Sequence, residues 1–120
     1  MNKILYVEDD EDTFNALKIL LEKQKYMVSG ATNGKDALVL ISKSKFDLIL
    51  LDIMLPDMSG WDIFQKIHKN YPDQKVAFLS VMVVSEERKK VLIKAGAVDY
   101  IMKPFEKDDL IIRINNILRN

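Results

Sequence analysis

Short apolar runs alternate with longer amphipathic segments along this chain, and this alternation constrains the fold more than any other feature. The apolar runs cover residues 4–7, 48–51 and 76–79, residues 27–31 are a weaker strand candidate, and residues 98–102 are the fifth strand candidate. Continuously apolar runs are typical of strands buried on both faces. The segments between them carry apolar residues at helical spacing. The pattern predicts five strand–helix units, and therefore a parallel sheet with helices on both faces.

Capping and breaking residues set the expected helix boundaries. The first helix is predicted over residues 12–23. Ser59 is the predicted N-cap of the third helix, and Pro72 ends it. Ser85 opens the fourth helix with acids in its first turn, and Gly96 ends that helix. The connections are only a few residues long, which is typical of one α/β domain over residues 1–120.

The composition excludes several classes of function. Lys+Arg and Asp+Glu both number 18, so the formal net charge is +0 and the basic excess typical of nucleic-acid binding is missing. The absence of cysteine excludes thiolate metal sites and cysteine nucleophiles. Acids follow the N-terminus too soon for a signal peptide, and no apolar run approaches membrane-spanning length. We expect a cytoplasmic protein that binds neither membranes nor nucleic acid directly.

Polar and charged residues follow the apolar runs, at the edge of the sheet where ligands bind in folds of this kind. These residues are Glu8, Asp9, Asp10, Asp52, Ser80 and Lys103. Clustered carboxylates repel one another, and a divalent cation relieves that repulsion. Oxygen ligands without His or Cys favour Mg²⁺ over zinc. A carboxylate at such a site can itself be the nucleophile and form an aspartyl phosphate.

Four segments carry a resemblance to a known family. They are Ile4-Leu5-Tyr6-Val7-Glu8-Asp9-Asp10, residues 47–60 with Asp52 and the Leu55-Pro56-Asp57-Met58-Ser59-Gly60 turn, Phe78-Leu79-Ser80, and residues 96–105 with Lys103-Pro104. From end to end the chain resembles the receiver domains of two-component response regulators. The resemblance implies a (βα)5, flavodoxin-like fold with a doubly wound, five-stranded parallel sheet in the order 2-1-3-4-5.

The resemblance also implies a phosphoacceptor and a magnesium site. Asp52 corresponds to the phosphoacceptor. Glu8 and Asp9 correspond to the acidic pair that holds Mg²⁺, with Asp9 as the direct ligand and Glu8 acting partly through water. Met54 would supply a backbone carbonyl to the metal. The phosphoryl group would come from a histidine kinase or a histidine phosphotransfer protein.

The resemblance further implies how the signal leaves the site. Ser80 and Lys103 would contact the phosphoryl oxygens, and Tyr100 would be the aromatic switch residue that turns inward as Ser80 moves. Lys103-Pro104 resembles the cis peptide of the family. The output surface would comprise the fourth helix, the fifth strand and the fifth helix. It would act on a downstream protein or a fused output domain.

Some residues depart from the family pattern or add to it. Val81 stands where the family usually has a small residue, which predicts narrower access for the phosphodonor. Met54 and Met82 flank the expected path of attacking water and cannot orient it, which predicts slow self-dephosphorylation. Both methionines can equally be space-filling residues. His68, the only histidine, is expected on the surface. Residues 88–90, with Asp99 and Arg113, are either a solvated helix face or a charged homodimer surface.

Three alternatives remain open on the sequence alone. A Mg²⁺-dependent aspartyl phosphatase requires Asp-x-Asp after the first strand, whereas this chain has Glu8-Asp9-Asp10. A degenerate receiver would be a constitutive protein-binding module. A flavin or nucleotide carrier requires a phosphate-binding loop in place of these acids. We favour a switch that catalyses only its own phosphorylation and dephosphorylation, and that is not an enzyme acting on other substrates.

Overall fold

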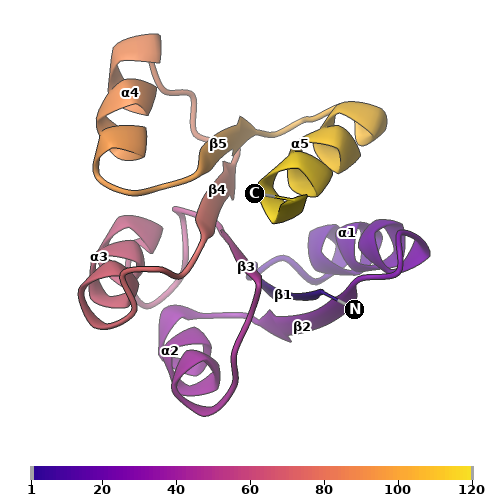
Figure 1. The fold of residues 1–120 in the computed structure, drawn as a ribbon, viewed down its shortest axis with the longest axis horizontal. Helices are drawn as coiled ribbons and strands as arrows, with labels where there is room; N and C mark the ends of the chain where they lie inside the picture. Colours follow the sequence, from indigo (N-terminus) through magenta and orange to yellow (C-terminus); the bar gives the residue numbers. More distant parts are fainter. Residues whose placement is uncertain (1, 120) are drawn as a thin grey trace.

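A computed structural model describes residues 2–119 and contains five strands and five helices in alternation (Figure 1). The elements are β1 (Lys3–Val7), α1 (Glu11–Lys23), β2 (Met27–Ala31), α2 (Gly34–Lys43), β3 (Leu48–Leu51), α3 (Gly60–Asn70), β4 (Val76–Ser80), α4 (Glu86–Lys94), β5 (Asp99–Met102) and α5 (Lys107–Arg119). The predicted order of five strand–helix units is confirmed.

The strands form one parallel sheet in the order β2-β1-β3-β4-β5. This is the predicted doubly wound order, in which the chain moves outward from β1 in both directions. Helices α1 and α5 cover one face of the sheet, and α2, α3 and α4 cover the other (Figure 1). The fold class inferred from the resemblance is therefore confirmed.

Each central strand supplies side chains to two hydrophobic cores, one on each face of the sheet. On β1, Ile4 and Tyr6 pack under α1 and α5, whereas Leu5 and Val7 pack under the other three helices. All four side chains are fully buried. Successive residues of a strand point to opposite faces, so a strand covered on both sides must be apolar at every position. The continuous apolar runs of the sequence have this cause.

The predicted helix boundaries hold to within one residue where caps could be identified. The side chains of Ser59 and Ser85 accept hydrogen bonds from the third residue after each, as N-caps do. Helix α1 begins at Glu11, one residue before the predicted start, because Asp10 is its N-cap. Gly96 follows the end of α4 with φ +119°, a left-handed conformation that favours glycine.

Two strand boundaries differ from the prediction. Strand β4 continues one residue further, to Ser80, because Ser80 pairs with Met102 in the ladder with β5. Strand β5 begins at Asp99 and not at Val98. The longer β4 places Ser80 at the carboxyl edge of the sheet.

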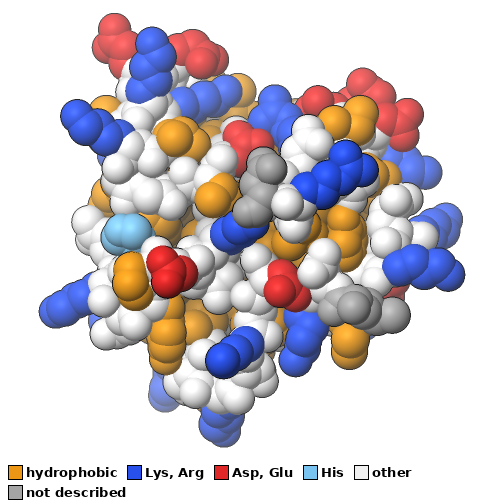
Figure 2. Space-filling view, in the orientation of Figure 1, with side chains coloured by type: hydrophobic (Ala, Val, Ile, Leu, Met, Phe, Trp, Pro, Cys, Tyr) orange, Lys and Arg blue, Asp and Glu red, His pale blue; other side chains and the backbone are white. Residues whose placement is uncertain are grey.

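The face of the molecule at the amino ends of the strands carries charges of both signs. Lys and Arg side chains lie among Asp and Glu side chains there, with apolar side chains between them (Figure 2). Within residues 2–119, no helix combines the length and the apolar character needed to cross a membrane.

Candidate functional site

Three polar side chains are buried at the carboxyl edge of the sheet. Glu8 follows β1, Asp52 follows β3 and Ser80 ends β4, with exposed fractions of 2%, 5% and 0%. β1 lies between β2 and β3, and β3 lies between β1 and β4, so the three strand ends are neighbours. Burial of two carboxylates is costly unless charges or hydrogen bonds compensate. Such burial marks this edge as the candidate site.

Glu8, Asp9 and Asp52 together can hold a metal ion. One carboxylate oxygen from each lies within 4.8 Å of the other two. Oxygens on opposite sides of Mg²⁺ are about 4.2 Å apart, since each metal–oxygen bond is about 2.1 Å long. A small contraction of the cluster would therefore bring these oxygens to coordination distance of a Mg²⁺ ion. Asp9 is exposed, so this side of the cluster opens to solvent, where a bound Mg²⁺ would keep its waters.

Lys103 brings a positive charge to the acids. Its ammonium pairs with Glu8 Oε1 and lies 3.5 Å from Asp52 Oδ2. Its backbone N–H donates to Ser80 O at 2.8 Å, which fixes the chain beside β4. The Lys103–Pro104 bond is cis, as the resemblance predicts. One lysine thus faces both buried carboxylates.

The pKa values of the two buried carboxyl groups are shifted in opposite directions. Burial raises the pKa of Asp52, against the opposing effects of a hydrogen bond from Met54 N–H (3.1 Å) and of the Lys103 charge. Burial also acts to raise the pKa of Glu8, but hydrogen bonds from Lys103, Tyr6 and the Asp10 amide outweigh it and lower that pKa. Glu8 is therefore the better stabilised anion. Burial makes Asp52 more basic than an ordinary aspartate, as suits the predicted nucleophile.

The predicted switch residues meet at the backbone of Met82. The hydroxyl of Tyr100 donates to Met82 O at 2.6 Å, and Met82 N–H donates to Ser80 Oγ at 3.3 Å. Tyr100 is 2% exposed, so its ring lies inside the protein. A movement of Ser80 would therefore reach the loop before α4 through one residue. The switch roles of Ser80 and Tyr100 stay predictions.

The loop after Asp52 is held by contacts that the sequence does not reveal. Gly60 N–H donates to Ile53 O at 2.8 Å, and a Cβ at Gly60 would lie 2.1 Å from the backbone oxygen of Asp52. Asp57 accepts hydrogen bonds from the N–H groups of Gly34 and Lys35, at 2.8 and 2.9 Å. The loop is thereby tied to the first turn of α2. A turn-forming Asp gives no sequence signal of such a distant partner.

Other residues singled out from the sequence lie on the surface. Met54, Val81 and Met82 are 55%, 58% and 40% exposed. Their predicted effects on donor access and water attack stay predictions. His68 is exposed, as expected, and its ring stacks on Phe64 with centroids 5.6 Å apart.

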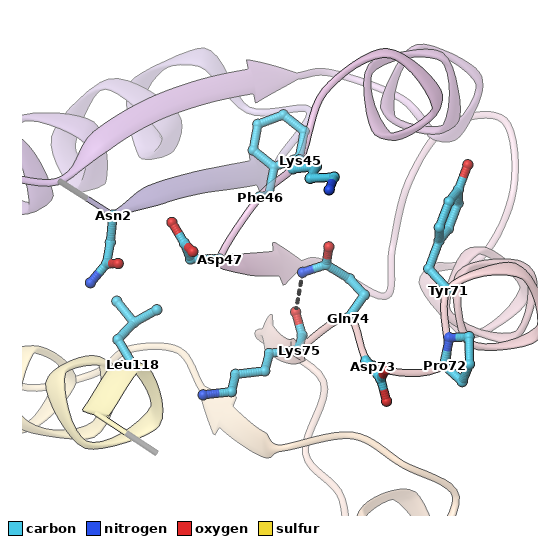
Figure 3. A pocket seen from close by; sticks show the side chains of 10 residues that line it. All are labelled: Asn2, Lys45, Phe46, Asp47, Tyr71, Pro72, Asp73, Gln74, Lys75 and Leu118. Carbon is cyan, nitrogen blue, oxygen red and sulfur yellow. Dashed lines mark hydrogen bonds between the residues drawn. The ribbon is translucent and has the colours of Figure 1, made fainter.

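A cavity of about 490 Å³ lies at the opposite edge of the sheet (Figure 3). Its lining includes Phe46 and Asp47 before β3, and Gln74 and Lys75 before β4. The side chains shown there come from segments at the amino ends of strands and the carboxyl ends of helices (Figure 3). The carboxylate cluster with its lysine is at the other end of the strands, so we assign the chemistry there.

Comparisons with known proteins agree with this fold. Residues 4–115 match the family model of the response regulator receiver domain. The chain is 36% identical over 119 residues to the transcriptional regulatory protein PcoR of Escherichia coli, covering 99% of this chain and 52% of PcoR. The chain therefore belongs to the response regulator receiver family and is a phosphoacceptor signalling domain of a two-component system.

Solved structures show the same relationship. The non-phosphorylated HemR receiver domain of Leptospira biflexa matches with a TM-score of 0.92 and 35% identity, covering 100% of this chain and 96% of HemR. The response regulator TrrA of Thermotoga maritima, in complex with Mg(2+)-BeF, matches with a TM-score of 0.86 and 29% identity, covering 98% of this chain and 99% of TrrA. The chain spans about half the length of the curated relatives it matches.

Proposed function

We propose that Asp52 accepts a phosphoryl group from a phospho-histidine donor. The observation that carries this proposal is the meeting of the Glu8, Asp9 and Asp52 carboxylates within 4.8 Å, beside the Lys103 ammonium. A carboxylate oxygen of Asp52 forms the new bond to phosphorus as the P–N bond of the donor breaks. The leaving imidazole keeps the electron pair and takes up a proton from solvent.

The acidic cluster is the proposed Mg²⁺ site. Asp9 and Asp52 would be direct ligands, Met54 would offer its backbone carbonyl, and Glu8 would act partly through water. When bound, Mg²⁺ supplies positive charge that relieves carboxylate repulsion and stabilises the transferring phosphoryl group. The complex of the similar TrrA with Mg(2+)-BeF supports this assignment.

Lys103 and Ser80 are the proposed partners of the phosphoryl oxygens. Lys103 lies 3.5 Å from Asp52, so a short movement away from Glu8 would bring its ammonium to a phosphoryl group there. Ser80 would move toward the same group, and Met82 and Tyr100 would follow because their hydrogen bonds join them to Ser80. The change would then reach α4 and β5.

The surface of α4, β5 and α5 is the proposed output region. Val91 on α4 and Ile112 on α5 are 54% and 57% exposed, and Arg88 is also exposed. Arg113 pairs with Asp99 at 3.2 Å within the chain. Apolar side chains among ion pairs suit a protein partner or a second copy of the chain. Sedimentation equilibrium with and without phosphodonor tests for the homodimer.

The proposed partners follow from this chemistry. A histidine kinase or histidine phosphotransfer protein supplies the phosphoryl group, and a downstream protein or fused output domain receives the signal. Such donors place the proposed action in the cytoplasm. The chain would catalyse only its own phosphorylation and dephosphorylation, so we expect no turnover of a model phosphate ester.

The first test is phosphorylation by acetyl phosphate, measured by intact mass with and without Mg²⁺. We expect one phosphoryl adduct on the wild type that requires Mg²⁺, and none on Asp52→Asn. Asp73→Asn is the matched control, since Asp73 is exposed beyond the end of α3 and has no predicted role. It should be phosphorylated like the wild type.

Two other outcomes would change the assignment. An adduct that persists on Asp52→Asn would move the phosphoacceptor to another residue. A wild type that accepts no phosphoryl group from acetyl phosphate or from a phospho-histidine donor, while still binding Mg²⁺, would favour the degenerate binding module.

A further inference from the structure

The hydroxyl of Tyr6, on β1, reaches the acidic site from the hydrophobic core between the sheet and helices α1 and α5. On a strand, residues two apart share a face, so Tyr6 and Glu8 point to the same side of β1. The phenol donates a hydrogen bond to Glu8 Oε1 at 2.9 Å, and the tyrosine is fully buried. Its ring stacks on Phe14 of α1, with centroids 5.5 Å apart and planes 16° apart. This packing aims the hydroxyl at Glu8.

The carboxylate of Glu8 has three donors. Oε1 accepts from the Tyr6 hydroxyl and from the Lys103 ammonium, and Oε2 accepts from Asp10 N–H at 3.2 Å. With two donors, Oε1 has used both of its lone pairs, whereas Oε2 has one left. A metal or its bound water would therefore meet Glu8 through Oε2. The Tyr6 hydrogen bond on Oε1 fixes which oxygen is presented.

Lys103 is shared between two carboxylates, whereas Tyr6 is not. Lys103 contacts Glu8 and lies 3.5 Å from Asp52, where the proposed phosphoryl group would attract it. If Lys103 moves there, Glu8 loses its charged partner while it is still 2% exposed. Tyr6 and the Asp10 amide then remain to stabilise the anion. A buried carboxylate that loses its donors becomes costly and free to reorient.

We propose that Tyr6 is a positioning residue that orients the Glu8 carboxylate for Mg²⁺, independently of Lys103. This inference rests on the proposed function of the acidic cluster. Tyr6 touches neither metal nor phosphoryl group and acts only through Glu8. Within an apolar run its ring is typical of a core side chain, so the sequence gives no sign of a role at the site.

The test is the Mg²⁺ affinity of Tyr6→Phe, measured by isothermal titration calorimetry. Phenylalanine keeps the ring that stacks on Phe14 and removes only the hydroxyl. Loss of a hydrogen-bond partner behind a metal ligand typically weakens metal affinity by 10–100-fold, so we expect a loss of about tenfold. Tyr26→Phe is the matched control, because its hydroxyl bonds Asn115 of α5 and not a residue of the acidic site. It should bind Mg²⁺ like the wild type.

Measuring the effect of Tyr6→Phe on Mg²⁺ affinity in a second background, Glu8→Asp, separates a role in positioning Glu8 from a general packing effect. Glu8→Asp keeps the negative charge but retracts it by one methylene, beyond hydrogen-bond reach of the phenol. We expect Tyr6→Phe to cost little further Mg²⁺ affinity in this background, because Tyr6 then has no carboxylate to orient. An equal loss in both backgrounds would show that Tyr6 acts through packing, and would overturn the proposal.

The outcomes also separate this inference from the function on which it rests. If the wild type binds Mg²⁺ and Tyr6→Phe binds it equally well, the role of Tyr6 is refuted and the phosphoacceptor function is untouched. If the wild type itself binds no Mg²⁺, both the metal site and the role of Tyr6 are refuted.

Discussion

Two loops border the acidic site, and they are held in different ways. In the loop between β3 and α3, a backbone hydrogen bond joins Gly60 to Ile53. The side chain of Asp57 joins the same loop to the first turn of α2. The close approach of Gly60 to the backbone of Asp52 leaves no room for a side chain. This loop holds Asp52 in place.

The loop between β4 and α4 has fewer such ties and exposes apolar side chains. Val81, Met82 and Val83 are 58%, 40% and 83% exposed. Side-chain hydrogen bonds join Met82 to Ser80 and Tyr100, and Ser85 to the start of α4. Segments with few buried contacts open at low free energy. The comparison indicates a fixed loop that positions Asp52, the proposed phosphoacceptor, and a second loop that can rearrange.

The largest effect on stability should come from adding a side chain at position 60. In Gly60→Ala the new Cβ would lie 2.1 Å from the Asp52 backbone oxygen, so the backbone must shift. We expect a loss of about 3 kcal/mol in the free energy of unfolding, at the upper end of overpacking costs. Urea denaturation measures it. Val83→Ala in the other loop should change stability by less than about 0.5 kcal/mol. Equal costs in the two loops would contradict the comparison.

The next effect concerns water attack on the aspartyl phosphate. The Met82 thioether is only a weak hydrogen-bond acceptor, whereas the amide of Met82→Gln can hold a water firmly. One hydrogen bond of about 1 kcal/mol corresponds to about fivefold in rate. We expect the phosphoryl half-life to shorten by about fivefold, as followed by intact mass after removal of the donor. Val83→Gln adds the same polar group one residue further on and should leave the half-life unchanged. A half-life unaffected by Met82→Gln would mean that Met82 only fills space.

The sequence was sufficient for the elements of this fold because each prediction used local information. Continuous apolar runs and the caps at Ser59 and Ser85 depend on neighbours in the chain, and they located the strands and helices. The strand order came from the family resemblance. Carboxyl ends of parallel strands meet at one edge, so the sequence alone could place Glu8 and Asp52 together.

The missed residues act across long sequence separations or from within an apolar run. Asp57 bonds Gly34, which lies 23 residues earlier in the chain. The need for glycine at position 60 arises from its contact with the end of β3. Tyr6 is fully buried in β1, and only the position of Glu8 shows that its hydroxyl has a polar partner. Local patterns of charge and hydrophobicity do not encode the contacts of Asp57 and Gly60. The contact of Tyr6 with Glu8 is local, but the apolar run around Tyr6 hides it.

A smaller effect should follow from releasing the β4–α4 loop. Tyr100→Phe removes the hydroxyl that donates to Met82 O at 2.6 Å and keeps the ring in the core. A net hydrogen bond contributes about 1 kcal/mol, so the amides of residues 81–84 should exchange with deuterium up to about fivefold faster. The amides of the β3–α3 loop should not change. Tyr71→Phe, at an exposed tyrosine, is the control, and general acceleration in both loops would refute a local tether.

The smallest effect should come from replacing Asp57, whose side chain ties the β3–α3 loop to α2, because Asp57 is exposed. Hydrogen bonds from the Gly34 and Lys35 amides lower the pKa of Asp57 from its ordinary value of 3.8. A carboxylate with a depressed pKa stabilises the fold above its unfolded pKa, and this stability is lost as the pH falls through the folded value. The urea midpoint of the wild type should therefore exceed that of Asp57→Asn at pH 7, and the difference should shrink below about pH 4.

The pH series distinguishes the charge of Asp57 from its shape. Asparagine keeps one acceptor oxygen, so it can still bond one of the two amides. It loses the second hydrogen bond and the negative charge at the start of α2, and only the charge depends on pH. A difference between wild type and Asp57→Asn that stays constant with pH would show that the charge does not matter. Asp73→Asn, which removes an exposed acid without such amide partners in the described structure, should show no comparable loss on acidification. If it did, general charge and not the tether would hold the β3–α3 loop.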